Sequence, residues 1–142
     1  MILADTGFFV ALASPRDLWH SSARRALAEL KAPLVTTWPV LTETCHLLLS
    51  RLGPDAQARF VASVERGALA VHALEGKHLP RVQELMEKYR ELPMDLADAS
   101  LVILAEELGR GDIVSTDRRE FGAYRWKNRK PFRNLLRDPI GR

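Results

Sequence analysis

Short apolar runs alternate with longer amphipathic segments along the chain. Runs of three or four mainly apolar residues between turn-forming residues are typical of buried strands, and they predict strands at 2–4, 34–37, 69–71 and 113–115. Apolar residues at helical spacing predict helices at 8–13, 18–31, 39–53, 55–67, 77–91 and 94–108. Strands that alternate with helices indicate an α/β fold, with a short central parallel sheet flanked by helices.

Local signals set the expected ends of several helices. Asp17 and Asp55 are predicted to cap the helices that follow them, because a carboxylate accepts from free N–H groups in a first turn. Pro39 suits a first helical position. After Asp117 the pattern weakens, and only Phe132 and the pair at 135–136 suggest one more strand.

The composition predicts one globular domain over residues 1–142. The chain has 142 residues, of which 46% are hydrophobic and 27% charged, values that exclude a disordered chain. A single cysteine, Cys45, excludes an internal disulfide and a Cys-rich zinc site. The N-terminus has no basic signal-peptide region, and no apolar run is long enough to span a membrane. We therefore expect a cytoplasmic protein with no membrane partner.

The charge is unevenly distributed. Residues 118–142 hold nine basic side chains and two acidic ones, a net charge of +7, whereas residues 1–117 carry a net charge of −4. A basic C-terminal segment on an acidic body suggests a polyanionic partner such as nucleic acid. The alternative is a solvated tail that only improves solubility.

Five carboxylates lie at positions where the active sites of α/β proteins commonly form. Asp5 and Asp117 follow predicted strands, and Glu43 lies early in the helix after the second strand. Asp98 lies early in the last predicted helix, with Asp95 three residues before it on the expected same helical face. If the sheet is parallel, all of them lie at the edge formed by the carboxyl ends of its strands.

Clustered carboxylates repel one another and lose hydration, so such a cluster is stable only if some of the acids are protonated or a cation neutralises them. All-oxygen ligands favour Mg²⁺ or Mn²⁺. One or two such ions would support hydrolysis of a phosphodiester. Taken singly, each acid could instead be a turn former, a helix cap or a partner of a helix dipole.

Four motifs in order resemble PIN-domain nucleases. They are Asp5-Thr6-Gly7-Phe8-Phe9-Val10-Ala11-Leu12, Thr42-Glu43 with the leucines at 47–49, Leu96-Ala97-Asp98-Ala99-Ser100-Leu101, and Ser115-Thr116-Asp117-Arg118-Arg119-Glu120-Phe121. Each motif is weak alone, but the four in sequence are specific, and they span the chain from Met1 to about Arg125. The size and layout look like the VapC-type toxins.

The resemblance implies an endoribonuclease toxin that cleaves RNA with Mg²⁺ or Mn²⁺. It implies that the metal ligands are Asp5, Glu43, Asp98 and Asp117, with Thr6, Asp95 and Ser115 in supporting positions behind them. It also implies a small cognate antitoxin and a homodimer, for which the apolar faces at 18–30 and 57–64 are candidates. The basic segment supplies candidate RNA contacts: Arg118, Arg119, Arg125 and Lys127.

Other interpretations remain open at this point. Phe121, Tyr124 and Trp126 could pack on the sheet, or Tyr124 and Trp126 could stack on RNA bases. The Asp5-Thr6-Gly7 triplet also occurs in aspartic proteases, but the helical pattern after it argues against an all-β fold. The domain could also bind RNA or a partner without catalysis, or act as a phosphatase or DNA nuclease.

Overall fold

The computed structural model describes residues 1–139 and contains a parallel sheet with the strand order β3-β2-β1-β4-β7. Its strands are β1 (Ile2–Ala4), β2 (Leu34–Thr37), β3 (Leu69–His72), β4 (Asp112–Val114) and β7 (Arg133–Asn134). A separate antiparallel hairpin joins β5 (Arg125–Trp126) to β6 (Lys130–Pro131). The four strands predicted from apolar runs are all present, and β7 lies beside β4 at the sheet edge.

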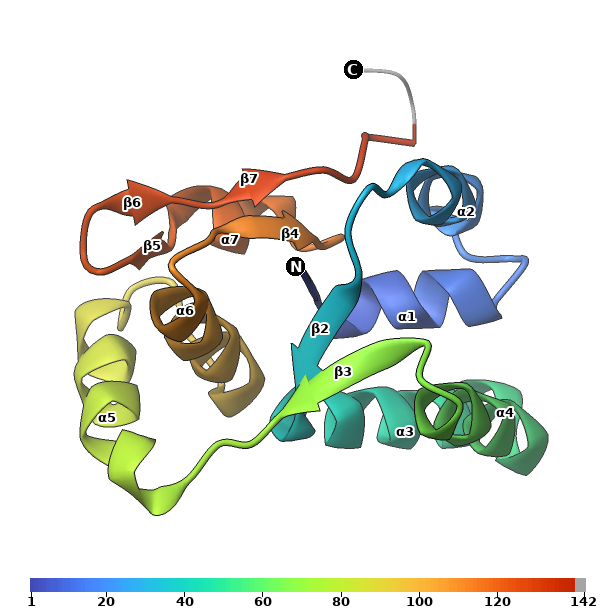
Figure 1. Cartoon of the computed structure of the whole chain (residues 1–142), viewed down its shortest axis with the longest axis horizontal. Coiled ribbons are helices and arrows are strands. Elements are labelled where there is room, and N and C mark those ends of the chain that lie inside the picture. Colours follow the sequence, from blue (N-terminus) through green and yellow to red (C-terminus); the bar gives the residue numbers. More distant parts are fainter. Residues whose placement is uncertain (140–142) are drawn as a thin grey trace.

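Helices surround this sheet, so the predicted α/β class with a short central parallel sheet is confirmed. The helices are α1 (Thr6–Ala13), α2 (His20–Glu29), α3 (Trp38–Leu52), α4 (Pro54–Glu65), α5 (Leu79–Lys88), α6 (Leu96–Leu108) and α7 (Arg118–Ala123), with a 3₁₀ turn, η1, at Gly76–His78. In Figure 1, α5 and α6 lie to the left of β2 and β3, and α1, α2 and α4 lie to the right. Within residues 1–139, no helix is long and apolar enough to cross a membrane.

Two predicted helix caps are wrong, for local steric and hydrogen-bonding reasons. α4 begins at Pro54, because proline lacks the N–H that a first turn leaves free, and Asp55 therefore lies inside the first turn. The Asp17 carboxylate accepts from the N–H of Trp19, at 2.8 Å, and closes a turn before α2 rather than capping the helix itself. The prediction at Pro39 is correct, since the proline lies in the first turn of α3.

The core centres on α6, which is buried without interruption from Ala97 to Ala105. It packs against α3, α5, β2 and β5, so even its polar first turn lies inside the molecule. Asp95 caps this helix, because its carboxylate accepts from the N–H of Asp98 at 2.8 Å. Asp95 therefore precedes the helix. The prediction that it shares a helical face with Asp98 is wrong.

The basic C-terminal segment is folded onto the sheet as far as residue 139. The sequence did not predict α7 or the hairpin, because these short elements carry too few apolar residues to show a period. Phe121, Tyr124 and Trp126 are buried, so the suggestion that Tyr124 and Trp126 stack on RNA bases is wrong and packing is correct. Arg142, the last of the nine basic residues, lies outside the described residues.

Candidate metal centre

Three aspartates from distant parts of the chain meet at one edge of the sheet. One carboxylate oxygen from each of Asp5, Asp98 and Asp117 lies within 4.8 Å of the other two. Asp5 directly follows β1, and Asp117 follows β4, its parallel neighbour. The carboxyl ends of these strands meet at that edge, and the first turn of α6 brings Asp98 to the same place.

The other two predicted acids line the same site without joining the triad. Glu43 from α3 and Asp95 before α6 both line a cavity of about 310 Å³ that the three aspartates share. The negative charges of Glu43 and Asp95 contribute to raising the pKa of Asp5, so both act on it electrostatically. The sequence-predicted acids thus face one cavity, three in close contact and two around them.

Hydrogen bonds fix the orientation of the triad. The Ser115 hydroxyl donates to Oδ2 of Asp5 at 2.9 Å, and the N–H of Asp117 donates to the same hydroxyl oxygen at 2.9 Å. The N–H of Thr6 donates to Oδ1 of Asp5 at 2.8 Å. One serine therefore links the acid after β1 to the acid after β4.

Two further residues that hold the site were missed from the sequence. The Asn134 side chain on β7 accepts from the N–H of Ser115 at 3.3 Å and donates to its carbonyl at 2.9 Å. The buried Tyr124 hydroxyl donates to Oδ2 of Asp98 at 3.2 Å. Only the pairing of β7 with β4 and the fold-back after α7 reveal these contacts, since no local signal marks them.

The aspartates hold their protons unusually firmly. Burial raises the pKa of Asp5 to about 6, despite hydrogen bonds from Ser115 and Thr6 that lower it. Burial and then the charges of Asp95 and Asp5 raise the pKa of Asp98 to about 8. Burial and the neighbouring Glu120 raise that of Asp117 to about 7. The site therefore has an unmet demand for positive charge near neutral pH.

The donor set fits a hard divalent cation. The converging ligands are carboxylate oxygens, which Mg²⁺ and Mn²⁺ prefer. Thr6 adds a hydroxyl oxygen that is buried and has no hydrogen-bond partner within residues 1–139. Thr6 lines the same cavity, so this unpartnered polar atom lies close to the aspartates.

Glycine allows a close approach where the segments that carry Asp5 and Asp117 touch. A Cβ atom on Gly7 would lie 1.9 Å from the hydroxyl oxygen of Thr116, well inside contact distance. With any larger residue at this position, the Thr116 side chain or the first turn of α1 would have to shift. This close approach brings Asp5 and Asp117 together.

The cationic side chain that lines the acidic cavity is not one of the predicted RNA contacts. The cavity is lined by Arg51 of α3 and by Trp19 before α2, neither of which was a candidate. The four predicted RNA contacts do not line it: Arg118, Arg119, Arg125 and Lys127. Arg125 donates to three carbonyls at the end of α7, and the N–H of Lys127 donates to Glu106 at 2.6 Å.

Known proteins share this architecture and sequence pattern. The PIN domain family model matches residues 2–127. Ribonuclease VapC26 of Mycobacterium tuberculosis (strain ATCC 25618 / H37Rv) is 24% identical over 124 residues, which cover 87% of this chain and 92% of that protein. The crystal structure of Mycobacterium tuberculosis VapC20, described as a sarcin-ricin loop cleaving toxin, aligns with a TM-score of 0.77 and 24% identity over 83% of this chain and 91% of that one.

Proposed function

The chain belongs to the PIN-domain family, and on that premise we propose that it is a metal-dependent endoribonuclease and the toxin of a toxin–antitoxin pair. The observation that carries the proposal is the meeting of Asp5, Asp98 and Asp117, whose oxygens lie within 4.8 Å of one another. The names of the two relatives, a ribonuclease and a sarcin-ricin loop cleaving toxin, support RNA as the substrate class.

We assign the metal site to the three aspartates, with Glu43 and Asp95 as further acids around it and Mg²⁺ or Mn²⁺ as the ion. One or two bound ions would supply the positive charge that stabilises a phosphodiester as its bond to the leaving oxygen breaks. Ser115 keeps the Asp5 carboxylate turned toward Asp117. Tyr124, whose pKa burial raises far above neutral, stays protonated and donates to Asp98.

The substrate would be held by side chains on both sides of the acids. Arg51 lines the cavity and is placed to contact a phosphate, and Trp19 beside it offers an apolar surface for a base. Arg118 and Arg119 follow Asp117 directly, and we keep both as candidate backbone contacts. Arg125 and Lys127 remain candidates for RNA that extends toward the β5–β6 hairpin.

The test is RNA cleavage with Mn²⁺, with Mg²⁺ and with a chelator. We expect the wild type to cut RNA with either ion, leaving 5′-phosphate ends, and to stop in chelator. Asp5→Asn should be inactive, and Asp55→Asn, an exposed acid on α4, should match the wild type. Equal cleavage in chelator would refute the metal dependence. RNA binding without turnover under any ion would favour a non-catalytic domain, and cutting matched DNA equally well would refute RNA as the substrate class.

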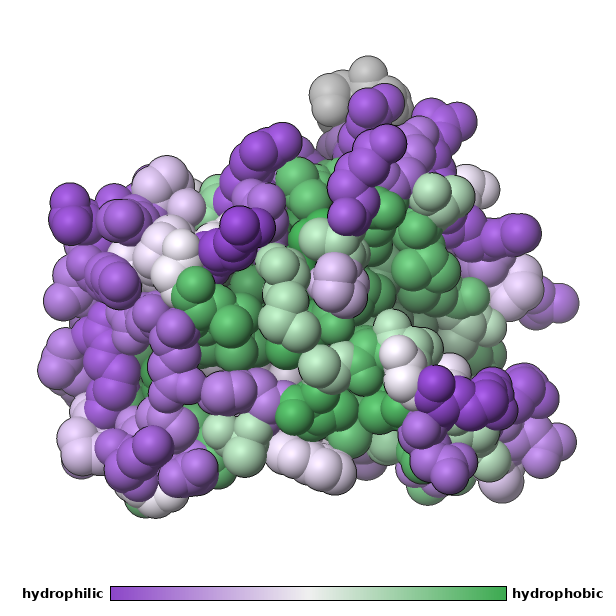
Figure 2. Space-filling model, viewed as in Figure 1, coloured by the Kyte–Doolittle hydropathy of each residue, from purple (hydrophilic) through white to green (hydrophobic). Residues whose placement is uncertain are grey.

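We propose a small antitoxin as the protein partner. A basic side chain of that partner could enter the acidic cavity and neutralise the aspartates. Figure 2 shows a broad apolar area over the middle of the face that presents β2 and β3. A cavity of about 330 Å³ between α1, α2 and α4 is lined by Phe9, Leu12 and Phe60, among other residues, and would take apolar side chains of the same partner. Copurification with the product of a neighbouring reading frame is the check, and a chain that expresses alone without toxicity would count against it.

We also propose a homodimer. The two helices offered by the sequence each keep an apolar side chain exposed: Leu27 on α2 is 47% exposed and Val61 on α4 is 48% exposed. Light scattering on wild type, Leu27→Glu and Val61→Glu tests this. A monomeric wild type at micromolar concentration would refute the dimer.

A further inference from the structure

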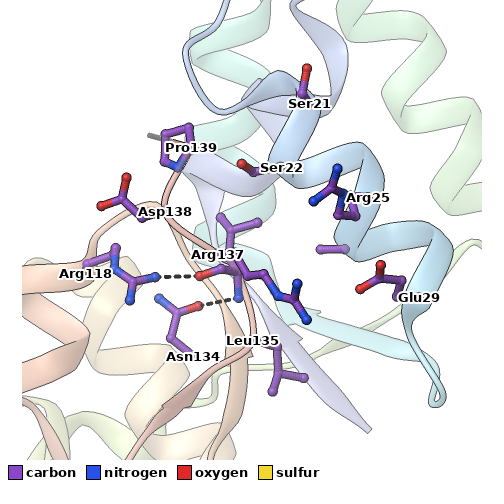
Figure 3. Close-up of a pocket in the computed structure, with 12 residues that line it drawn as sticks. Ser21, Ser22, Arg25, Glu29, Arg118, Asn134, Leu135, Arg137, Asp138 and Pro139 are labelled. Atoms are coloured by element: carbon purple, nitrogen blue, oxygen red, sulfur yellow. Dashed lines mark hydrogen bonds between the residues drawn. The ribbon is translucent and has the colours of Figure 1, made fainter. Parts of the chain in front are cut away.

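A second polar cavity, of about 550 Å³, lies between α2 and the C-terminal segment that follows β7 (Figure 3). Its lining includes two serines and Arg25 from α2, Arg118 from the start of α7, and Asn134 and Arg137 from the C-terminal segment. Figure 3 shows the three arginines reaching into the space between these elements. None of the candidate metal ligands lines it.

The charge of this cavity is mainly positive and largely unused. Within residues 1–139, none of Arg25, Arg118 and Arg137 forms an ion pair with a carboxylate. Two acids, Glu29 and Asp138, also line the cavity, so its net charge is lower than that of the three arginines alone. Three guanidinium groups that form no ion pair with a carboxylate in the described part of the chain line one concave site. Such a site favours binding of an anion.

The cavity is partly organised before any ligand arrives. The Arg118 guanidinium donates to the carbonyl of Leu136, which fixes its side chain across the cavity. The N–H of Leu136 donates in turn to the Asn134 side chain at 3.1 Å. A side chain that is already held loses less entropy when it binds, so Arg118 gains affinity from this contact.

Neighbouring residues of the same two segments line the two cavities. Asp117 lines the acidic cavity and Arg118, the next residue, lines the arginine cavity. At the start of α2, Trp19 lines the first cavity and Ser21 lines the second. An RNA strand held at the aspartates therefore has the arginine cavity as a neighbouring site along both segments.

We infer that the arginine cavity is a subsite for a backbone phosphate of the RNA, next to the phosphate that is cleaved. This inference rests on the proposed function and names a contact outside the metal site. Arginine forks match phosphate oxygens in pairs, and serine hydroxyls such as those of Ser21 and Ser22 are common additional donors to phosphates. This contact depends on the charge of the RNA backbone and does not itself select among bases.

The test compares Arg25→Gln and Arg137→Gln, singly and together, with Arg24→Gln as the matched control. Arg24 is the exposed neighbour of Arg25 on α2 and lines neither cavity. Both target arginines are also exposed, so the variants should fold, and circular dichroism checks this. Arg118 is left unchanged because its bond to Leu136 holds the C-terminal segment.

Binding of single-stranded RNA is measured by fluorescence anisotropy over a range of salt concentrations, in an Asp5→Asn background that does not cleave. We expect the double variant to raise Kd about tenfold and to reduce the slope of log K against log salt by about 0.7, since one phosphate contact contributes about 0.7 for single strands. Arg24→Gln should change neither value. An unchanged Kd and slope in the double variant would overturn the inference.

Two further arms separate other outcomes. If inorganic phosphate protects wild type against thermal unfolding and the double variant loses this effect while RNA affinity is unchanged, the cavity holds a small anion and the inference is overturned. If an acidic peptide is the only ligand whose affinity falls, the inference is overturned as well. Wild type that neither binds nor cleaves RNA overturns the proposed function itself, whereas wild type that cleaves beside an unaffected double variant overturns only the subsite.

Discussion

Two clusters of ionisable side chains in this molecule are built on opposite principles. In the first, the Glu107 carboxylate lies between two histidines, with Nε2 of His72 at 2.6 Å and Nε2 of His78 at 2.5 Å. The N–H of Glu75 donates to Nδ1 of His78, so the proton of that ring is on Nε2, facing Glu107. Burial alone would raise the pKa of Glu107, but these two hydrogen bonds lower it overall.

The aspartate cluster has the reverse character. Its members are all acidic, and burial together with mutual repulsion raises the pKa of Asp5, Asp98 and Asp117. In the histidine–glutamate cluster, hydrogen bonds with two histidines stabilise the carboxylate. The aspartate cluster has a deficit that only protons or a cation can fill. The comparison indicates that unmet charge, rather than the number of ionisable groups, makes the aspartate cluster the candidate functional site.

The largest expected effect is on RNA cleavage, which should depend on the aspartate cluster and not on the histidine–glutamate cluster. Asp98→Asn should reduce RNA cleavage at least about a hundredfold, because losing a ligand removes several kcal/mol of charge stabilisation. Glu107→Gln should stay within about twofold of wild type, since one hydrogen-bond loss outside the cavity does not reach the reacting atoms. The measurement is initial rate of cleavage with Mn²⁺. Loss of activity in Glu107→Gln alone would reverse the functional assignment of the clusters.

The next effect concerns stability in the absence of metal. Because the folded-state pKa of each aspartate is raised, their contribution to stability is present below the unfolded pKa, near 4, and is lost as pH rises through about 6 to 8. The metal-free protein should therefore unfold more easily at pH 8.5 than at pH 5. Asp98→Asn should be more stable than wild type at pH 8.5 by about 2 kcal/mol. Urea unfolding in chelator measures both, and equal stability of the two proteins at pH 8.5 would contradict the prediction.

At the histidine–glutamate cluster we expect a smaller effect on folding stability, with the opposite dependence on pH. The pKa of Glu107 is lower in the folded than in the unfolded protein. Its contribution to folding stability is therefore present above the unfolded-state pKa and is lost as pH falls through the folded-state pKa. Glu107→Gln should therefore destabilise the protein by about 1 kcal/mol at neutral pH, a value kept small because Glu107 is partly exposed. The deficit should shrink toward pH 3. Thermal unfolding at several pH values tests the sign, and a deficit that grows in acid would show that the histidines do not hold the carboxylate.

The smallest effect tests how the aspartate cluster is held. Asn134→Ala removes both side-chain contacts to Ser115 and should loosen the Asp5–Ser115–Asp117 link. We expect cleavage to fall about fivefold, corresponding to about 1 kcal/mol. Asn128→Ala, on the hairpin turn, is the control and should leave the rate unchanged. If Asn134→Ala lowered thermal stability without changing the metal concentration needed for half activity, its role would be structural only.

Much of the fold follows from sequence because it is local. The spacing of apolar residues in the sequence predicts buried strands such as Ile2–Ala4 and buried helices such as Leu96–Leu108. The acids at strand ends and helix starts were also identifiable, since the carboxyl edge of a parallel sheet is where sites form. The elements after Asp117 were not predicted, because α7 and the hairpin are too short to repeat a pattern and pack through isolated residues such as Tyr124.

The sequence by itself determined the class of fold and the set of acids from which the site is built. Only the tertiary structure decided that Asp5, Asp98 and Asp117 meet while Glu43 and Asp95 line the wall around them. It also decided that Arg51 and Arg25 line the two cavities, although both lie outside the basic segment. The physical reason is that periodicity reports how a residue is buried within its own element, whereas distances between charges depend on the order of strands and on which helix packs above them.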